Sequence, residues 1–257
     1  MDFITAFILG IVQGVSEFLP ISSTGHMILA SHLMGIAHTE FHKSFEIAIQ
    51  AGTILSVVVL YWRTLLIDIE VMKRIIVAFL PTGILGLTLY KLIKGYLLGS
   101  ENVVLGSLLI GGIVLIAFEC WYREKDDAAS EIREISYKNA FIIGLFQSIA
   151  MIPGVSRSAS TIVGGLILGL KRKTIVEFTF LLAVPTMLAA TAYDLLKSGS
   201  QFSAGEFQYL MVGFVTAFIV AILSIKFLLR FIRTHTFIPF GVYRIVLVVL
   251  WILLLKV

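Results

Sequence analysis

The feature that most constrains the fold of this chain is a short polar stretch, residues 13–26, inside an apolar N-terminal region. Its sequence, QGVSEFLPISSTGH, combines a carboxylate, an imidazole, a run of three hydroxyl side chains, glycine and proline. Polar groups of this kind are costly inside a membrane unless they are paired or hydrated, so a cluster of them indicates a functional site. The rest of the chain is then expected to be the scaffold that holds this stretch.

The composition indicates that this scaffold is helical and embedded in a membrane. Of the 257 residues, 58% are hydrophobic and only 14% are charged, and the mean hydropathy is +0.99. The net charge of +4 does not indicate a nucleic-acid partner, because the basic residues lie in short loops between apolar runs. The single cysteine, Cys120, excludes an intrachain disulfide and a cysteine-based metal site.

Six segments have the length of about 20 residues that a membrane-spanning helix requires. They are approximately Phe45–Trp62, Ile75–Leu98, Val103–Tyr122, Phe178–Leu196, Tyr209–Leu229 and Phe237–Leu255. Two further apolar regions, Phe3–Gly35 and Ala140–Leu170, are interrupted near the middle by Pro, Gly, Ser and Thr. Their uninterrupted pieces are too short for a comfortable span, which predicts two re-entrant hairpins of half-helices.

The two halves of the chain are similar to each other. The GxxQ sequence at residues 10–13 returns at residues 144–147, and the polar turn at Ser22 returns at Ser156. A hairpin that enters and leaves on one side, followed by three crossings, starts the second half on the opposite side, so the copies must be inverted. We therefore predict an all-α polytopic membrane protein with one integral membrane domain, residues 1–257, comprising a first repeat (1–122), a cytoplasmic loop (123–138) and a second, inverted repeat (139–257).

The basic residues predict the orientation. Thirteen lie in loops on one face, namely Arg63, Lys73, Arg74, Arg123, Lys125, Arg133, Lys138, Lys171, Arg172, Lys173, Lys226, Arg230 and Arg233. Five lie on the other face, namely Lys43, Lys91, Lys94, Lys197 and Lys256. Because basic loops stay in the cytoplasm, both termini are expected on the outer face of the membrane and the longest loop, 123–138, in the cytoplasm. Of the two basic residues within membrane segments, Arg157 belongs to a hairpin, and Arg244 is expected to extend its side chain toward the interface.

Both hairpins contain the signature of a helix start. Ser22–Gly25 directly precedes the apolar run 26–34, and the sequence PGVSRS at residues 153–158 precedes a second run in the same way. Two half-helix N-termini that face each other form an anion site from backbone N–H groups and hydroxyls. Arg157 adds a guanidinium fork suited to bidentate phosphate contact. The pattern predicts a phosphate site within the membrane.

Glu17 and His26 favour hydrolysis over passive binding. A carboxylate repels phosphate unless a cation lies between them or the carboxylate handles a proton. Glu17 is therefore a candidate ligand for a divalent metal, Mg²⁺ or Ca²⁺, shared with phosphate oxygens. His26 is a candidate general acid or base, or the nucleophile itself, and Ser23 is the alternative nucleophile with His26 as its base.

Each feature also has a structural alternative. A Ser-Ser-Thr run mediates helix packing in many membrane proteins, and a lone histidine is often interfacial. Arg157 can pair with Glu17 as a purely structural ion pair. Glu46 and Gln50, one turn apart on the first span, either line the same cavity or bond to neighbouring helices. The serine run, the histidine and Arg157 occur together in two matching breaks of the chain, and this joint occurrence favours the functional interpretation.

These residues resemble the motifs of the undecaprenyl-pyrophosphate phosphatase family, the membrane enzymes linked to bacitracin resistance. Gln13-x-x-x-Glu17 is similar to that family's E/Q-x-x-x-E motif, and residues 18–26, FLPISSTGH, continue it. Residues 153–158, with Thr161 after them, are similar to the second motif. The resemblance runs the whole length of the chain.

The resemblance implies hydrolysis of undecaprenyl (C55) pyrophosphate to undecaprenyl phosphate and inorganic phosphate. This reaction recycles the lipid carrier for peptidoglycan synthesis and confers bacitracin resistance. The resemblance also implies a divalent-metal requirement and an active site that opens on the outer face of the bacterial cytoplasmic (inner) membrane. The implied catalytic residues are Glu17, Ser23, His26 and Arg157. The implied substrate-binding residues are Gln13, Ser22, Thr24, Gly25, Gly154, Ser156, Ser158 and Thr161.

Two points stay open from the sequence. Gln13 stands where many family members carry Glu, so if the metal needs a second carboxylate, Glu46 is the nearest candidate. A transporter or flippase for a polyprenyl phosphate or another organic anion is the alternative function, because inverted repeats with broken helices also build transport sites. The expected partners are the polyprenyl pyrophosphate lipid and membrane lipids, with no nucleic acid, and a homodimer is left open.

Overall fold

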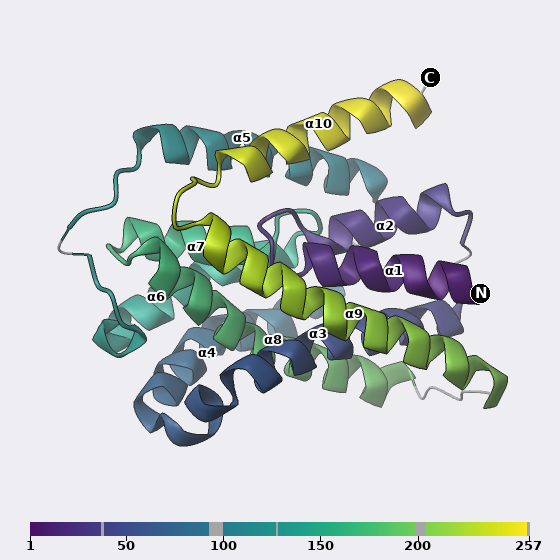
Figure 1. Cartoon of the computed structure of the whole chain (residues 1–257), viewed down its shortest axis with the longest axis horizontal. Helices are drawn as coiled ribbons and strands as arrows, with labels where there is room; N and C mark the ends of the chain where they lie inside the picture. The colour runs from purple at the N-terminus through teal and green to yellow at the C-terminus, as the bar shows by residue number, and fades with distance from the viewer. Residues whose placement is uncertain (37–38, 93–99, 127, 199–203, 256–257) are drawn as a thin grey trace.

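The computed structural model describes residues 1–36, 39–92, 100–126, 128–198 and 204–255. Over these ranges the secondary structure is helical, apart from one isolated β-bridge between Ala129 and Leu170. The helices, labelled in Figure 1, are α1 (Phe3–Ser16), α2 (Ser23–Leu33), α3 (Glu40–Ile67), α4 (Ile69–Leu92), α5 (Glu101–Trp121), α6 (Tyr137–Ser148), α7 (Arg157–Ile167), α8 (Arg172–Ser198), α9 (Ala204–Phe231) and α10 (Ile238–Leu255), with two short 3₁₀ turns at Ile132–Glu134 and Ile149–Met151.

Six of the described helices, α3, α4, α5, α8, α9 and α10, are long and apolar enough to cross a membrane, which confirms the six predicted spans. The second span begins earlier than expected, at Ile69 rather than Ile75. The reason is local, because the Asp68 carboxylate accepts a hydrogen bond from the Val71 amide at 3.2 Å and so caps the helix start. The expected end of that span at Leu98 lies outside the described residues.

The two interrupted regions form helical hairpins, as predicted. In the first, α1 ends at Ser16 and α2 begins at Ser23. In the second, α6 ends at Ser148 and α7 begins at Arg157. Each of these helices has between 11 and 14 residues, at most half the length of the longest spans in the bundle.

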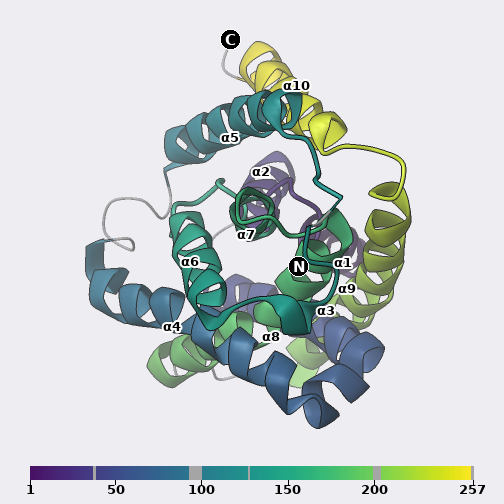
Figure 2. The same cartoon turned by 90° about the vertical axis from the view of Figure 1, so that its left-hand side faces the viewer.

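The half-helices α2 and α7 lie at the centre of the bundle. In Figure 2 they are seen between the α5–α10 pair on one side and α3, α4 and α8 on the other. The first helix of each hairpin packs along a span of the other half of the chain, α1 on α9 and α6 on α4. The hairpins enter from opposite ends, so their breaks meet in the interior (Figure 1).

Glycine permits the close approach of these helices. A Cβ at Gly10 of α1 would lie 2.8 Å from the Gly213 carbonyl oxygen of α9. A Cβ at Gly144 of α6 would overlap the Ala78 carbonyl oxygen of α4. Small residues at such contacts let membrane helices approach backbone to backbone, which is how both hairpins are fixed in the bundle.

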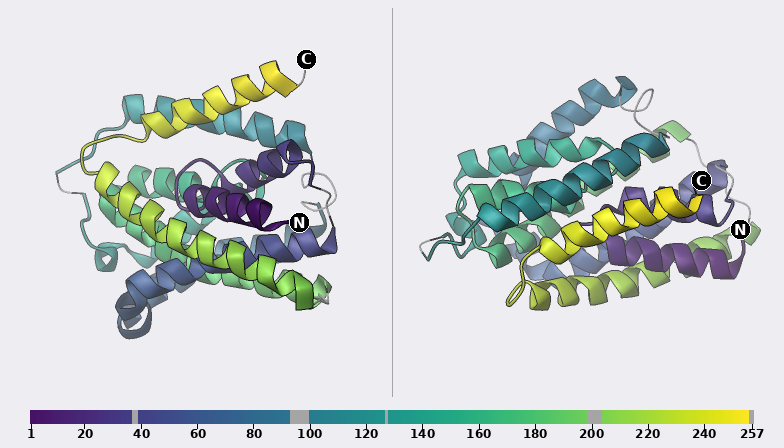
Figure 3. Two further views of the ribbon diagram at one scale, coloured as in Figure 1. Left: turned by 45° about the vertical axis from the view of Figure 1, so that its right-hand side comes forward. Right: turned by 90° about the horizontal axis from the view of Figure 1, so that it is seen from above.

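The basic loops gather at one end of the molecule. Arg133 pairs with Asp68 at 2.8 Å, Arg74 donates to the Ile135 carbonyl at 2.7 Å, and Lys171 donates its amide to the Ala129 carbonyl at 3.0 Å. These bonds join the α3–α4 turn, the 122–136 segment and the start of α8. The start of α1 and the end of α10 both lie at the opposite end of the molecule (Figures 1 and 3).

Candidate functional site

A polar cavity of about 180 Å³ lies where the breaks of the two hairpins meet. Both hairpins and the spans α3 and α8 contribute to its wall, which is formed by Glu17, Ser22, Ser23, Thr24, Gln50, Ala150, Gly154, Ser156, Arg157, Thr186, Met187 and Ala190. The structure thus brings together seven of the residues that the sequence analysis singled out from the hairpins. Gln50 joins them from α3, as one of the two interpretations of that residue predicted.

The N-termini of α2 and α7 open onto this cavity with the same local geometry. Ser22 has φ 74° and its hydroxyl accepts from the Gly25 amide at 3.3 Å. Ser156 has φ 78° and its hydroxyl accepts from the Ala159 amide at 3.2 Å. The left-handed conformation is unfavourable for serine, by roughly 1–2 kcal/mol, so each cap is strained at the site. The first amides of both helices lack intrahelical acceptors and are available to an anion.

Glu17 and Arg157, 140 residues apart, form an ion pair on the cavity wall. Arg157 Nη2 donates to Glu17 Oε1 at 3.0 Å, and Gln13 Nε2 donates to Oε2 of the same carboxylate at 2.7 Å. Arg157 also donates to the Thr179 carbonyl at 3.4 Å. A guanidinium has five N–H donors, so this pairing leaves several for a ligand. The predicted pair exists, and both members face a space that a phosphate can enter.

Some expected substrate-binding residues do not lie on the cavity. Ser158 is buried and its hydroxyl donates to the Phe18 carbonyl at 2.8 Å, which ties the second hairpin to the first. The Thr161 hydroxyl donates to the Arg157 carbonyl within α7. Gly25 packs on α5, where an added Cβ would lie 3.3 Å from Leu108. These three residues support the site from behind its wall.

His26 is turned away from the described cavity wall. Its Nδ1 donates to the Ser22 carbonyl at 2.7 Å, which in a neutral imidazole leaves Nε2 to accept from the Tyr243 hydroxyl of α10 at 2.8 Å. The two rings are stacked, with centroids 5.5 Å apart and planes inclined by 7°. Ser23 does line the cavity. Of the two candidate nucleophiles, Ser23 is therefore the one that lines the polar cavity.

The donor set around Glu17 fits a metal that is completed by substrate. Glu17 is the cavity's carboxylate, whereas Glu46 is not among its lining residues and lies 3.4 Å from His42. Among the described residues no group of three His, Cys, Asp or Glu side chains could hold a metal without other ligands. Mg²⁺ usually binds through one or two carboxylates together with phosphate oxygens and water. Glu17 supplies one carboxylate, and Gln50 and Ser23, which also line the cavity, carry further oxygen atoms.

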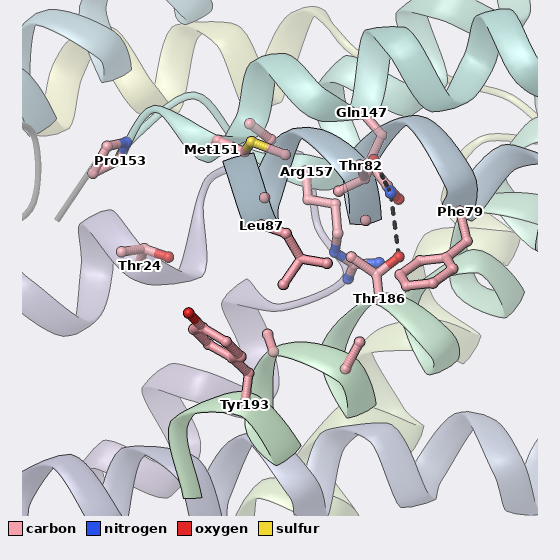
Figure 4. Close-up of a pocket in the computed structure, with 15 residues that line it drawn as sticks. Thr24, Phe79, Thr82, Leu87, Gln147, Met151, Pro153, Arg157, Thr186 and Tyr193 are labelled. Atoms are coloured by element: carbon pink, nitrogen blue, oxygen red, sulfur yellow. Dashed lines mark hydrogen bonds between the residues drawn. The ribbon is translucent and has the colours of Figure 1, made fainter. Parts of the chain in front are cut away.

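An apolar groove of about 440 Å³ adjoins the polar cavity. The two spaces share wall residues, namely Thr24, Ala150, Arg157, Thr186 and Ala190. Most of the groove is apolar, with Phe79, Leu87, Met151 and Pro153 around it (Figure 4). Leu87 is 67% exposed, so the groove opens on the outside of the helix bundle. A ligand with an anionic head and an apolar tail matches this pair of spaces.

Sequence reasoning missed part of the groove. Gln147 Nε2 donates to the hydroxyls of Thr82, at 2.9 Å, and Thr186, at 3.2 Å (Figure 4). Each threonine follows a proline inside a span, Pro81 in α4 and Pro185 in α8. A proline within a membrane helix followed by a hydroxyl residue is the signal that could have indicated this wall.

The expectation that Arg244 reaches toward the interface is wrong. Its side chain is fully buried and donates four hydrogen bonds to backbone carbonyl oxygens. Glycines explain how a guanidinium fits between helices here, because a Cβ at Gly111 of α5 would overlap it. The sequence alone shows a basic residue near a helix end, and only the packing of α5 against α10 shows that it turns inward.

The fold and the site define a multi-pass helical membrane protein with a polar cavity between two broken hairpins. A family model described as bacitracin resistance protein BacA matches residues 6–250. The chain is 58% identical to an undecaprenyl-diphosphatase of Aquifex aeolicus (strain VF5) over 242 residues, 94% of each chain. It is 55% identical to a protein of the same name from Sulfurihydrogenibium sp. (strain YO3AOP1), covering 98% of this chain and 99% of the relative. The chain belongs to the BacA bacitracin resistance protein family. Its membership in this family and its six helices of membrane-spanning length indicate a multi-pass inner-membrane protein.

Proposed function

We propose that this chain hydrolyses undecaprenyl pyrophosphate to undecaprenyl phosphate and inorganic phosphate, which recycles the lipid carrier for peptidoglycan synthesis and confers bacitracin resistance. The relatives' shared name, undecaprenyl-diphosphatase, supports the reaction class. The observation that carries the proposal is the Glu17–Arg157 pair on a cavity where two helix N-termini meet, next to an apolar groove.

The two spaces divide the substrate between them. The pyrophosphate lies in the polar cavity, where Arg157 and the first amides of α2 and α7 bind its oxygens. The first isoprene units lie in the groove along Leu87 and Met151. The rest of the C55 chain leaves through the groove's opening beside α4 into the membrane.

Ser23 is the better-placed nucleophile. Its hydroxyl oxygen attacks the terminal phosphorus, the bond from that phosphorus to the bridging oxygen breaks, and prenyl phosphate leaves with the hydroxyl proton. Water then releases the phosphate from the serine. Arg157 stabilises the charge on the transferring group. His26 acts on this step through the Ser22 carbonyl that it holds, or as a base after a change of rotamer.

A divalent metal, Mg²⁺ or Ca²⁺, would be held by Glu17 and the phosphate oxygens. When bound, it would neutralise charge on the phosphates and polarise them toward attack. Gln13 keeps the Glu17 carboxylate in place through the 2.7 Å hydrogen bond. Glu46 would contribute only if its helix turn approached the cavity more closely than it does here.

We also propose that residues 1–122 and 139–257 are inverted repeats joined by the cytoplasmic loop 123–138. The local match at Ser22 and Ser156 and the exchanged packing of α1 on α9 and α6 on α4 support a two-fold relation in the membrane plane. Both termini and the opening of the active site would then face outward.

Phosphate release from purified protein tests the proposed function. The protein in detergent is given C15 or C55 prenyl pyrophosphate with Mg²⁺, with Ca²⁺ or with a chelator, next to a Glu17→Ala variant. Metal-dependent release that is lost in the variant is the expected result. Absence of release from folded protein with any metal would overturn the proposal, and transport of the prenyl phosphate in liposomes would then be measured.

A further inference from the structure

Arg244 is a buried cation with no assigned role in the proposed reaction. Its side chain is fully buried in α10, within the membrane-embedded part of the bundle. Burying a charged group is costly unless its hydrogen bonds are made inside the protein, and ionisable groups retained in membrane segments commonly serve function. The bonds that this guanidinium makes therefore show what it does.

The four acceptors of Arg244 belong to two places in the fold. Nε donates to the Leu108 carbonyl at 3.2 Å and Nη2 to the Ser107 carbonyl at 3.0 Å, both on α5. Nη1 donates to the Val155 carbonyl at 3.2 Å, and Nη2 also donates to the Gly154 carbonyl at 2.9 Å. Arg244 thus joins the α5–α10 pair to the turn that precedes α7.

That turn leads directly into the anion site. Gly154 and Val155 come immediately before Ser156, the strained cap of α7, and Arg157, the partner of Glu17. Gly154 has φ +92°, and a Cβ there would lie 2.6 Å from the Val104 carbonyl oxygen of α5. The turn therefore lies close against α5, and its two hydrogen bonds to the guanidinium hold it there. The position of this turn determines where α7 starts.

The neighbouring residue on α10 holds the other hairpin. The Tyr243 hydroxyl bonds to His26 Nε2 at 2.8 Å, and the two rings are stacked. Consecutive residues of one helix thus contact both hairpins close to the N-termini of α2 and α7. We propose that Arg244 is a positioning residue for hydrolysis, which fixes the Gly154–Val155 turn so that Arg157 and the α7 N-terminus face the cavity opposite Glu17.

The inference rests on the proposed function and is tested in the same phosphate-release assay. Lysine keeps the charge of Arg244 but lacks the planar fork that serves four carbonyls. Because misplacing a reacting group by about 1 Å can cost on the order of 100-fold in rate, we expect Arg244→Lys to lower kcat roughly 10- to 100-fold. Arg244→Met should lower it further, since a lysine restores part of the hydrogen bonding.

A double-variant cycle separates positioning from general destabilisation. We expect Arg157→Lys, which keeps the positive charge, to retain measurable activity, so Arg244→Lys can be added to it. If Arg244 acts through the placement of Arg157, the second substitution should change kcat by less than about threefold in that background. The inference would be overturned if the kcat losses of the two single variants multiplied in full in the double variant. It would also be overturned if Arg244→Lys were as active as the wild type.

A matched pair of glycine variants perturbs Arg244 without replacing it. Gly111→Ala places a methyl group against the guanidinium, whereas Gly106→Ala on the same helix meets nothing within 4 Å. We expect Gly111→Ala to reproduce the kcat loss and its non-additivity with Arg157→Lys, and Gly106→Ala to match the wild type. This pair carries the test if Arg244→Lys does not fold, and equal activity of the two alanine variants would overturn the inference. Wild-type phosphate release in the same experiment reports on the proposed function separately.

Discussion

Glu17 Oε1 and Arg157 Nη2 lie 3.0 Å apart, although the two residues belong to different hairpins. Glu17 lies in the break of the first hairpin, and Arg157 is the first residue of α7 in the second. Only 5% of the Glu17 side chain and 14% of the Arg157 side chain are exposed. The pair therefore has two consequences that can be separated by experiment. It neutralises two charges in the membrane interior, and it places a guanidinium and a carboxylate on the same anion site.

Removing one partner should cost more stability than removing both. Glu17→Ala leaves a nearly buried guanidinium without its counter-charge, which typically destabilises a protein by about 3–5 kcal/mol. In the Glu17→Ala/Arg157→Ala variant, much of that stability should return while phosphate release stays lost. Thermal unfolding in detergent and the release assay measure the two effects. A double variant that regains activity would show that the pair is structural only.

Ser23→Ala and His26→Ala should differ in how much activity they retain. Ser23 lines the cavity, so its loss removes the attacking oxygen and should reduce kcat to near background. His26→Ala should lose activity less completely, because the imidazole contacts Ser22 and Tyr243 rather than the cavity. A burst experiment with prenyl pyrophosphate labelled in its terminal phosphate checks whether that phosphate becomes attached to Ser23. Full loss in His26→Ala with an active Ser23→Ala protein would assign the nucleophile to His26.

The strained cap at Ser156 predicts an unusual order of stabilities. Ser156→Ala keeps the positive φ and loses the hydroxyl that caps Ala159, which should cost about 1 kcal/mol. Ser156→Gly also loses the cap but relieves the left-handed strain, so it should be more stable than Ser156→Ala. Thermal unfolding midpoints of the two variants give the comparison. A less stable glycine variant would show that the backbone at this position is not strained.

The contact between α6 and α4 should tolerate no side chain at Gly144. Gly144→Ala forces a methyl group into the Ala78 carbonyl and should destabilise the protein by about 1–3 kcal/mol through overpacking. Gly106→Ala is the control, because its methyl group meets nothing within 4 Å and alanine favours a helix. Equal stability of both variants would mean that the helices can separate without penalty.

The proposed orientation predicts which side of the membrane each end can be labelled from. The native Cys120 is exposed near the end of α5 that leads into the 122–138 segment. A membrane-impermeant maleimide should label it only in inside-out vesicles. In a Cys120→Ala background, Asp2→Cys should be labelled in intact cells, since the start of α1 lies at the opposite end (Figure 1). The reverse pattern would place both termini in the cytoplasm.

Much of the architecture could be predicted because it depends on local sequence. Hydropathy runs of span length gave the six crossing helices, and the serine caps beside Pro, Gly and Thr marked both breaks. The Glu17–Arg157 pairing was also within reach, as two opposite charges in apolar surroundings have few other ways to be satisfied. These features arise because exposing backbone polar groups and charges to lipid is costly. The apolar runs, capping residues and charges that avoid this cost are visible in the sequence itself.

Only the tertiary structure decided which polar side chains face the cavity. His26 turns to Tyr243, 217 residues away, and Arg244 turns inward because glycines on α5 leave room for it. Thr186 reaches the site from α8, and although Pro185 precedes it in the sequence, only the packing of the helices shows that Thr186 lines the cavity. A side chain in a helical bundle takes the direction that its neighbours on other helices allow. Those neighbours are set by packing between distant segments, which the periodicity of one segment does not contain.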